Sequence, residues 1–427
     1  MCQKQAIFDR NWQKSRRVLE KIGKMLLNLR DIARNISMAN KNSNLGAAKT
    51  AKNDEFYTQY LDIQKEVNAY VEYNPDVFKG KTILLPCDDP EWSNFTRFFV
   101  ENFELLGLKK LISTSYAVES KKIKEWEPTL FETEAPQYDA DKSRTNGKIF
   151  ILDGDKNNNG TIDVDDLKWE YLEGDGDFRS EEVKKLRDEA DVIITNPPFS
   201  LFREFVAWLI ESGKQFIIIG SQNSITYKEI FPLIKDNKLW LGNGFSHGDA
   251  YFRVPVHGRY SDQDYFNKEE GIVHFRNCCW FTNIDHGRRH EPLQLMTMKD
   301  NIKYSRHKEI KETGYLKYDN YDAIEVPYVD AIPSDYEGVM GVPVTFLDKY
   351  CPEQFVIIGA TESEGKGFSN GLWNKESTVS QPIKGGGYES TNDCLSKLRI
   401  QGFEKYDRPY LNGKRLYYRL LIRKSID

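Results

Sequence analysis

The stretch Asp191-Val-Ile-Ile-Thr-Asn-Pro-Pro-Phe199 decides the fold prediction, because a short β-branched run leads directly into an Asn-Pro-Pro-Phe turn. Such a run is typical of a buried strand. Pro197 and Pro198 fix φ at about −65° and donate no backbone hydrogen bond, and Pro197 also restrains Asn196 to extended backbone. The sequence therefore predicts a rigid turn at the end of a buried strand.

The same pattern recurs on both sides of this turn. Other short apolar runs stand at residues 82–85, 111–112, 149–152, 216–219 and 238–241. Apolar residues at helical spacing lie between them, from Phe95 to Leu106 and from Leu201 to Leu209, the second ended by Gly213. Buried strands that alternate with amphipathic helices predict an α/β fold with a Rossmann-like, mainly parallel sheet. Ligands of such sheets bind at the carboxyl ends of the strands.

Composition divides the chain into three parts. Residues 1–52 carry twelve Lys or Arg and three Asp or Glu on a chain with a net charge of −5, and their apolar residues recur at helical spacing. This predicts a basic helical arm with a linker, either for a polyanionic partner or as a solvated amphipathic helix. We expect a ligand-binding α/β domain over 53–245. Residues 246–427 are dense in aromatic residues, Gly and Pro, which predicts a β-rich C-terminal domain.

Composition also excludes several classes of protein. The chain is 39% apolar and 29% charged, and no apolar run approaches the ~18 residues of a membrane span. Its start does not resemble a signal peptide, and its six cysteines form no CxxC spacing, so we expect a cytoplasmic protein without a membrane partner. HExxH, GxSxG and P-loop patterns are missing, which argues against a catalytic metal, a serine hydrolase and an NTPase.

The Asn-Pro-Pro-Phe turn has its own chemistry. The side-chain oxygen of Asn196 and the carbonyl of Pro197, held close together, would form two acceptors for one –NH₂ group. Phe199 beside them can stack on a planar ring. Two acceptors favour the rehybridisation of an exocyclic amine while it attacks an electrophilic carbon, so the turn predicts group transfer to such an amine. The alternative is an ordinary Pro-Pro turn after a strand.

The turn resembles the catalytic motif of S-adenosylmethionine-dependent amino-methyltransferases, and the chain is similar to one family among them, the EcoRI-type adenine-specific DNA methyltransferases. The similar stretches are 53–67, 82–95, 174–182, 190–206, 216–242, 338–350, 372–377 and 412–422. The resemblance implies S-adenosyl-L-methionine as cofactor and double-stranded DNA as substrate, with the adenine flipped out of the duplex. It also implies that 246–427 recognise the DNA target and that a cognate restriction endonuclease shares the site.

The resemblance assigns roles by position. Catalytic roles fall on Asn196, Pro197, Pro198 and Phe199. Cofactor contacts fall on Tyr57, Thr58, Pro86, Cys87, Asp88, Asp89, Asp177, Phe178, Asn196 and Phe202. In this assignment Asp177 accepts from the amino group of the cofactor's adenine and Phe178 packs on its ring. The sequence departs from the common methyltransferase pattern in two places: the loop at 86–90 is not glycine-rich, and no acid directly follows the second strand, where Glu119 is the nearest candidate.

Other functions remain open at this point. The same two-acceptor clamp would serve methylation of cytosine N4, of RNA or of a protein glutamine. A different class is a calcium-responsive DNA-binding protein with an inactive transferase site, because 155–166 have the ligand spacing of a calcium loop. Asp166 at the last position is shorter than the usual Glu, and a predicted strand precedes the loop, so a paired-helix calcium site is disfavoured. A calcium loop followed by a single helix over 164–172 remains possible.

Overall fold

The computed structural model of the protein describes residues 57–88, 93–117, 130–156, 158, 160, 162, 166, 168–245, 249–253, 266–267, 272–361, 368–369, 371–372, 381–382, 388–389, 409–412 and 414–425. The chain divides into two units, Met1–Asn53 and Asp54–Asp427, and all described residues belong to the second. The basic arm predicted for residues 1–52 therefore lies outside the described residues. Within the described part, no helix is long and apolar enough to cross a membrane.

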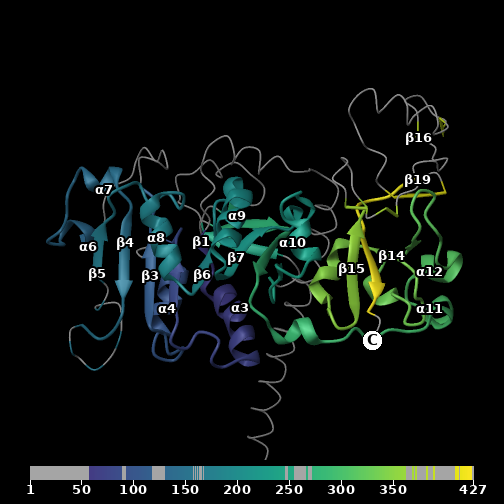
Figure 1. The fold of residues 1–427 in the computed structure, drawn as a ribbon, viewed down its shortest axis with the longest axis horizontal. Helices are drawn as coiled ribbons and strands as arrows, with labels where there is room; N and C mark the ends of the chain where they lie inside the picture. Colours follow the sequence, from purple (N-terminus) through teal and green to yellow (C-terminus); the bar gives the residue numbers. More distant parts are fainter. Residues whose placement is uncertain are drawn as a thin grey trace, which may run out of the picture. The chain divides into compact units, whose positions relative to one another are not determined.

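The largest sheet of the described part has eight strands, which run from β5 at the left of Figure 1 to its middle. Every apolar run predicted to be a strand contributes to it. In spatial order the strands are β5 (Lys168–Tyr171), β4 (Lys148–Leu152), β3 (Lys110–Thr114), β2 (Thr82–Leu85), β6 (Val192–Thr195), β7 (Gln215–Ser221), β12 (Cys278–Thr282) and β8 (Trp240–Leu241).

The sheet is mixed, so the expectation of a mainly parallel sheet holds only for its centre. Strands β3, β2, β6 and β7 run parallel, whereas β4 and β5 at one end and β12 and β8 at the other pair antiparallel. Apolar runs of either direction look alike in sequence, which is why the direction of these strands could not be predicted. The helix considered over 164–172 is wrong: Lys168–Tyr171 form β5, in which Trp169 is buried between exposed Lys168 and Glu170.

Helices cover both faces of this sheet. Neighbouring residues of a strand point to opposite faces, and in β7 Phe216 and Ile218 join one buried cluster while Ile217 and Ile219 join the other. The first cluster includes apolar residues of α8 (Glu181–Glu189) and α9 (Phe202–Ser212), and the second includes those of α3 (Tyr60–Tyr73) and α4 (Asn94–Glu101). Helix α9 ends as predicted at Gly213, whose φ of 65° is left-handed.

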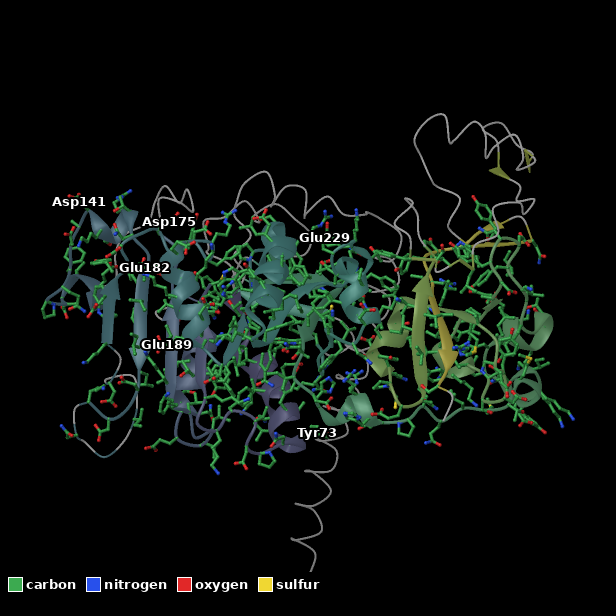
Figure 2. All side chains as sticks on the ribbon, in the orientation of Figure 1. Tyr73, Asp141, Asp175, Glu182, Glu189 and Glu229 are labelled. Carbon is green, nitrogen blue, oxygen red and sulfur yellow. The ribbon has the colours of Figure 1, made fainter. Side chains whose placement is uncertain are left out.

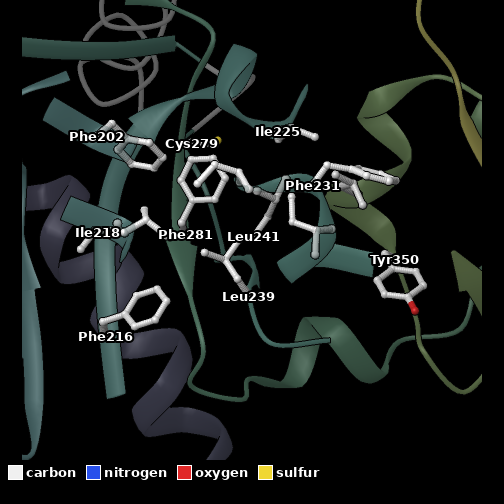
Figure 3. Close-up of a cluster of buried hydrophobic side chains, with 14 of the residues drawn as sticks. Phe202, Phe216, Ile218, Ile225, Phe231, Leu239, Leu241, Cys279, Phe281 and Tyr350 are labelled. Carbon is white, nitrogen blue, oxygen red and sulfur yellow. The ribbon is translucent and has the colours of Figure 1, made fainter. Parts of the chain in front are cut away.

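The region after residue 245 packs on the same core. Its four-stranded sheet has the order β13 (Ile324–Glu325), β14 (Met340–Val342), β20 (Leu420–Lys424) and β15 (Phe355–Ala360). Figure 3 shows Phe281 and Leu241 of the large sheet in one cluster with Phe231 of α10 (Phe231–Lys235) and with Tyr350. β12 and this apolar cluster join the parts before and after residue 245. The functional division at that residue stays a prediction.

Shorter elements complete the described part. They are the helices α6 (Leu130–Thr133), α7 (Lys142–Thr145), α11 (Met298–Tyr304) and α12 (Lys308–Thr313), and two ladders, β16 (Gln381–Pro382) with β17 (Tyr388–Glu389) and β18 (Tyr410–Leu411) with β19 (Lys414–Arg415).

A small antiparallel sheet stands at the carboxyl end of β7. It has the order β1 (Tyr57–Thr58), β9 (Asp249–Arg253), β11 (Ile272–Arg276) and β10 (Phe266–Asn267). A single residue, Asn277 with φ of 66°, separates β11 from β12 of the large sheet. The carbonyl of Asn277 accepts from the backbone of Gln222 just after β7 (2.7 Å). The small sheet is thus attached where the carboxyl ends of the parallel strands lie.

His290 joins two distant segments through carboxylates. Its Nε2 lies 2.8 Å from Asp285 and its Nδ1 lies 2.7 Å from Glu353, which precedes β15. Its ring stacks on Tyr73 at the end of α3. Figure 2 labels Tyr73 at the edge of the large sheet opposite to the edge near Asp175. Burial alone would lower the pKa of His290, but the two carboxylates outweigh it and hold this pKa above its usual value.

The raised pKa predicts a pH-dependent stability. Because the folded-state pKa of His290 exceeds the unfolded value of about 6.5, its contribution is full below that value and is lost as pH rises through the folded pKa. We expect His290→Gln to lower the free energy of unfolding by about 0.5–1 kcal/mol near pH 6, since the pair is partly exposed. At about pH 9 the two proteins should unfold alike. Urea titrations at both pH values measure this, and an equal loss at both would contradict it.

Candidate active site

The predicted rigid turn follows β6 and lies at the carboxyl edge of the parallel strands. We call Asn196–Phe199 the catalytic turn, after the role that the sequence predicts for it. Strand β6 is fully buried, Asn196 and Phe199 are half-buried, and Pro197 is buried. The carbonyl of Pro198 accepts from the backbone of Leu201 (3.0 Å) as the chain enters α9. The Pro197 carbonyl accepts no hydrogen bond from any residue that the structure describes. It therefore keeps the acceptor capacity that the sequence predicts for it.

Two neighbours orient the side chains of the catalytic turn. The amide nitrogen of Asn196 faces the hydroxyl of Thr58 at 3.5 Å, which directs the amide oxygen to the opposite side. Thr58 is itself fixed, since its carbonyl accepts from the side chain of Asn94 (2.8 Å). The ring of Phe199 meets Phe275 of β11 edge-on, with centroids 6.4 Å apart. The small sheet thus supports both ends of the catalytic turn.

Asp88 connects the loop after β2 to the catalytic turn. Its carboxylate is buried and accepts from the hydroxyls of Ser93 (2.7 Å) and Thr195 (2.6 Å). Ser93 is the N-cap of α4, where its side chain accepts from the backbone of Phe95 (3.1 Å). Thr195 directly precedes Asn196. One carboxylate therefore fixes the end of β6 relative to the start of α4, where a negative charge is also favoured by the helix dipole.

The rest of the loop after β2 is held by β3. The hydroxyl of Thr114 donates to the Pro86 carbonyl (3.0 Å), the backbone of Asp88 donates to the Thr114 carbonyl (3.1 Å), and Ser113 donates to the Asp88 carbonyl. Pro86 is buried, and Cys87 is the half-buried member of the loop. Asp89 lies outside the described residues. The loop is thus rigid without the glycine-rich form.

The segment that holds Asp177 lies at the end of the next strand, β3. The carbonyl of Asp175 accepts from the backbone of Ala117 (2.7 Å). Gly176, with φ of 80°, packs so closely on the Ser115 carbonyl that a Cβ there would overlap it. Figure 2 shows Asp175 on the side of Glu182, near the start of α8, and away from Glu189 at its other end. Strands β3, β2 and β6 are neighbours, so the candidate residues line one continuous edge.

Asp177 is engaged by a neighbouring arginine. Arg179 contacts both carboxylate oxygens, through Nε (2.9 Å) and Nη2 (2.6 Å), and its backbone donates to one of them (2.8 Å). Burial alone would raise the pKa of Asp177, but Arg179 outweighs it and holds this pKa below its usual value. The carboxylate is therefore charged at neutral pH and retains lone pairs for a further donor.

Two candidate cofactor residues belong to the core instead of the surface. Phe178 is 4% exposed and packs edge-on against Phe205 and Trp208. Phe202 is 1% exposed and packs on Phe281 and against Gly220. Both rings belong to one buried apolar cluster. A shallow hollow of about 500 Å³ beside Phe178, between α8 and α9, includes no residue of the catalytic turn, so we do not assign it to the chemistry.

The structure describes only part of the predicted calcium loop at residues 155–166. Asn157, Asn159, Thr161 and Asp163, which would supply ligands, lie outside the described residues. Asp155 and Asp166 accept backbone hydrogen bonds from Gly160 and Lys156 (both 2.8 Å). No group of three His, Cys, Asp or Glu side chains in the described ranges is arranged to hold a metal ion.

Sequence reasoning missed three residues of this site. Ser93 carried a usable signal, because a serine directly before an amphipathic helix is a typical N-cap. Thr195 carried a weaker signal as the last residue of the strand. Phe275 carried none, because its contact with Phe199 depends on the pairing of β9 and β11.

Comparison with known proteins decides the family. The model of the adenine-specific methyltransferase EcoRI family matches residues 44–425. The chain belongs to this family. The match begins before residue 53, where the resemblance in the sequence motifs began, and extends almost to the C-terminus.

Three curated relatives agree with the family. The chain is 43% identical to the Type II methyltransferase M.EcoRI of Escherichia coli over 319 residues, which cover 74% of this chain and 89% of the relative. It is 35% identical to M.MpnI of Mycoplasma pneumoniae (73% and 83% covered) and 33% identical to M.MgeORF184P of Mycoplasma genitalium (88% and 98% covered). No solved structure was found to match the chain. These matches confirm the predicted family. The mixed α/β structure is consistent with the fold of a methyltransferase.

Proposed function

We propose that this protein transfers a methyl group from S-adenosylmethionine to the N6 amine of an adenine at a specific site in double-stranded DNA. The observation that carries the proposal is the catalytic turn, with Asn196 and the unengaged Pro197 carbonyl next to the loop after β2. The family is adenine-specific, and its Type II relatives support DNA as the substrate. For the same reason we propose a restriction endonuclease with the same target site as partner.

The donor and acceptor groups at the carboxyl edge fit S-adenosylmethionine. The Asp177 carboxylate can accept from an adenine amino group, and Asp88 ties the loop of half-buried Cys87 to Thr195 at the end of β6. In our proposal Asp177, Tyr57, Thr58 and the 86–88 loop contact this cofactor, while Phe178 and Phe202 support them from the core. The cofactor supplies an electrophilic methyl group on a sulfonium, which leaves as the neutral thioether.

The catalytic turn acts on the amine. Asn196 Oδ1 and the Pro197 carbonyl each accept one N6–H, which favours a tetrahedral nitrogen with its lone pair free to attack. The nitrogen becomes positively charged as the new C–N bond forms, and it then releases a proton, so no strong base and no covalent enzyme intermediate are needed. Phe199, held by Phe275, stacks on the flipped base.

Methyl transfer to different substrates tests this function. We would incubate the protein with S-adenosylmethionine labelled in the methyl group and with duplex DNA, RNA or protein, and we expect label in DNA. Label only in RNA or protein would reject the substrate class. DNA binding with no label in any substrate would instead support a binding protein with an inactive site.

A further inference from the structure

The small sheet formed by β1, β9 and β11 has two faces of different character. On its inner face Thr58, Phe252 and Val273 are buried, and Phe275 meets the catalytic turn. The outer face includes alternate residues of the same strands: Tyr57, Tyr251, Arg253, Ile272, His274 and Arg276. In the register of the paired strands, Tyr251 lies opposite His274, and Arg253 lies between Tyr57 and Ile272.

The outer face carries aromatic and cationic side chains in accessible positions. Tyr251 is 49% exposed, and its ring stacks on His274 with centroids 4.7 Å apart and an interplanar angle of 10°. Arg253 and Arg276 are both exposed. The side chain of Arg253 has no ion pair or hydrogen bond to any residue in the described ranges, and its backbone pairs with Tyr57 and Ile272. Arg276, in contrast, already has an interaction partner. Arg253 is therefore the cation of this face most available to a partner.

This face adjoins the catalytic turn through the backbone. Arg253 follows Phe252, which pairs in register with Thr58, and Thr58 faces Asn196. His274 and Arg276 flank Phe275, which contacts Phe199. Both ends of the catalytic turn therefore contact this sheet, and residues of its outer face are the direct chain neighbours of the contacting residues.

We propose that the outer face of this sheet binds the sugar-phosphate strand of duplex DNA beside the flipped adenine, with Arg253 on a phosphate and the Tyr251–His274 pair against a neighbouring base or sugar. The inference rests on the proposed function and adds to it the residues that hold the substrate. Guanidinium groups match phosphate in charge and geometry, and aromatic rings next to them give stacking that tolerates any sequence.

Salt-dependent DNA binding tests the inference. The probe is a fluorescent duplex of mixed sequence, titrated at several salt concentrations with the unaltered chain, Arg253→Ala, Tyr251→Ala and Lys79→Ala. Lys79 is exposed and precedes β2, so it lies at the amino-terminal edge of the large sheet, opposite to the catalytic turn. Its variant is therefore a charge-matched control. We expect Arg253→Ala to weaken binding about 3–10-fold and to reduce the slope of log K against log salt by about 1. Tyr251→Ala should weaken binding about tenfold with the slope unchanged, and Lys79→Ala should match the unaltered chain.

Methyl transfer and self-association, measured on the same proteins, separate the outcomes. One outcome would overturn this inference alone. In it the unaltered chain methylates DNA, while Arg253→Ala and Tyr251→Ala keep the DNA affinity and the salt slope of the unaltered chain. The absence of any transfer by the unaltered chain, with the expected salt slopes retained, would overturn the proposed function and support the DNA-binding face. Self-association that Arg253→Ala abolishes, without a change in DNA affinity, would assign the face to a second copy of the chain. Unchanged thermal unfolding of the variants confirms that they fold.

Discussion

Asn196→Ala is expected to reduce methyl transfer at least about 100-fold, which is the usual loss when one preorganised group that stabilises a transition state is removed. The variant leaves one acceptor, the Pro197 carbonyl, for an amine that needs two. Binding of S-adenosylmethionine should change little, because the acceptor acts on the target amine. Initial rates at saturating cofactor and DNA measure the effect, and calorimetric titration measures cofactor binding.

A matched control separates the chemistry of this amide from a general effect of the substitution. Asn68 lies on the exposed side of α3, and Asn68→Ala should be fully active. Near-normal activity of Asn196→Ala would contradict the proposal that two acceptors hold the target amine. A large loss of cofactor affinity without a loss in kcat would instead assign Asn196 to cofactor binding.

Asp88→Asn is expected to lower both stability and kcat. The Asp88 carboxylate accepts from Ser93 and Thr195 in a buried position, so the change removes charge-assisted hydrogen bonds worth roughly 1.5–3 kcal/mol together with the placement of Thr195 beside Asn196. We expect kcat to fall about tenfold or more, because small displacements of a catalytic group are costly. The KM for cofactor should change less. Chemical denaturation and steady-state kinetics measure the two effects.

Variants of Thr195 and of an exposed aspartate test whether Asp88 acts by positioning. Thr195→Val removes one of the two hydroxyl donors and should lower kcat in the same direction, while Thr195→Ser keeps the hydroxyl and should restore it. Asp76, exposed and paired with Lys79, gives the control Asp76→Asn, which should behave as the unaltered chain. A raised KM for cofactor at unchanged kcat in Asp88→Asn would show that the carboxylate contacts the cofactor directly.

The strands and the catalytic turn could be predicted because local sequence determines them. Continuous apolar runs specify buried strands, and Asn196-Pro197-Pro198 specify a stiff turn whatever surrounds them. The helix α9 was predicted for the same reason, since Phe202, Phe205 and Leu209 repeat on one side. The direction of β4 and β12 depends instead on where the chain returns to the sheet, and no local pattern records that.

The candidate site was predicted less completely, because its supporting contacts join residues far apart in the sequence. Asp88 was recognised from its loop, but its hydrogen bond to Thr195 spans 107 positions and gives it a buried carboxylate. Phe178 and Phe202 were assigned to the cofactor by position, and their burial in one apolar cluster could not be read from their position in the sequence. Phe275 reaches Phe199 through strand pairing, which its aromatic-rich surroundings in the sequence did not reveal.

A crystal structure of this protein with a cofactor analogue and duplex DNA would test the central claim most directly. The account predicts an adenine outside the duplex, with its N6 within hydrogen-bonding distance of both Asn196 Oδ1 and the Pro197 carbonyl and with its ring on Phe199. A target base held by other residues, with Asn196 turned into the protein core, would contradict it.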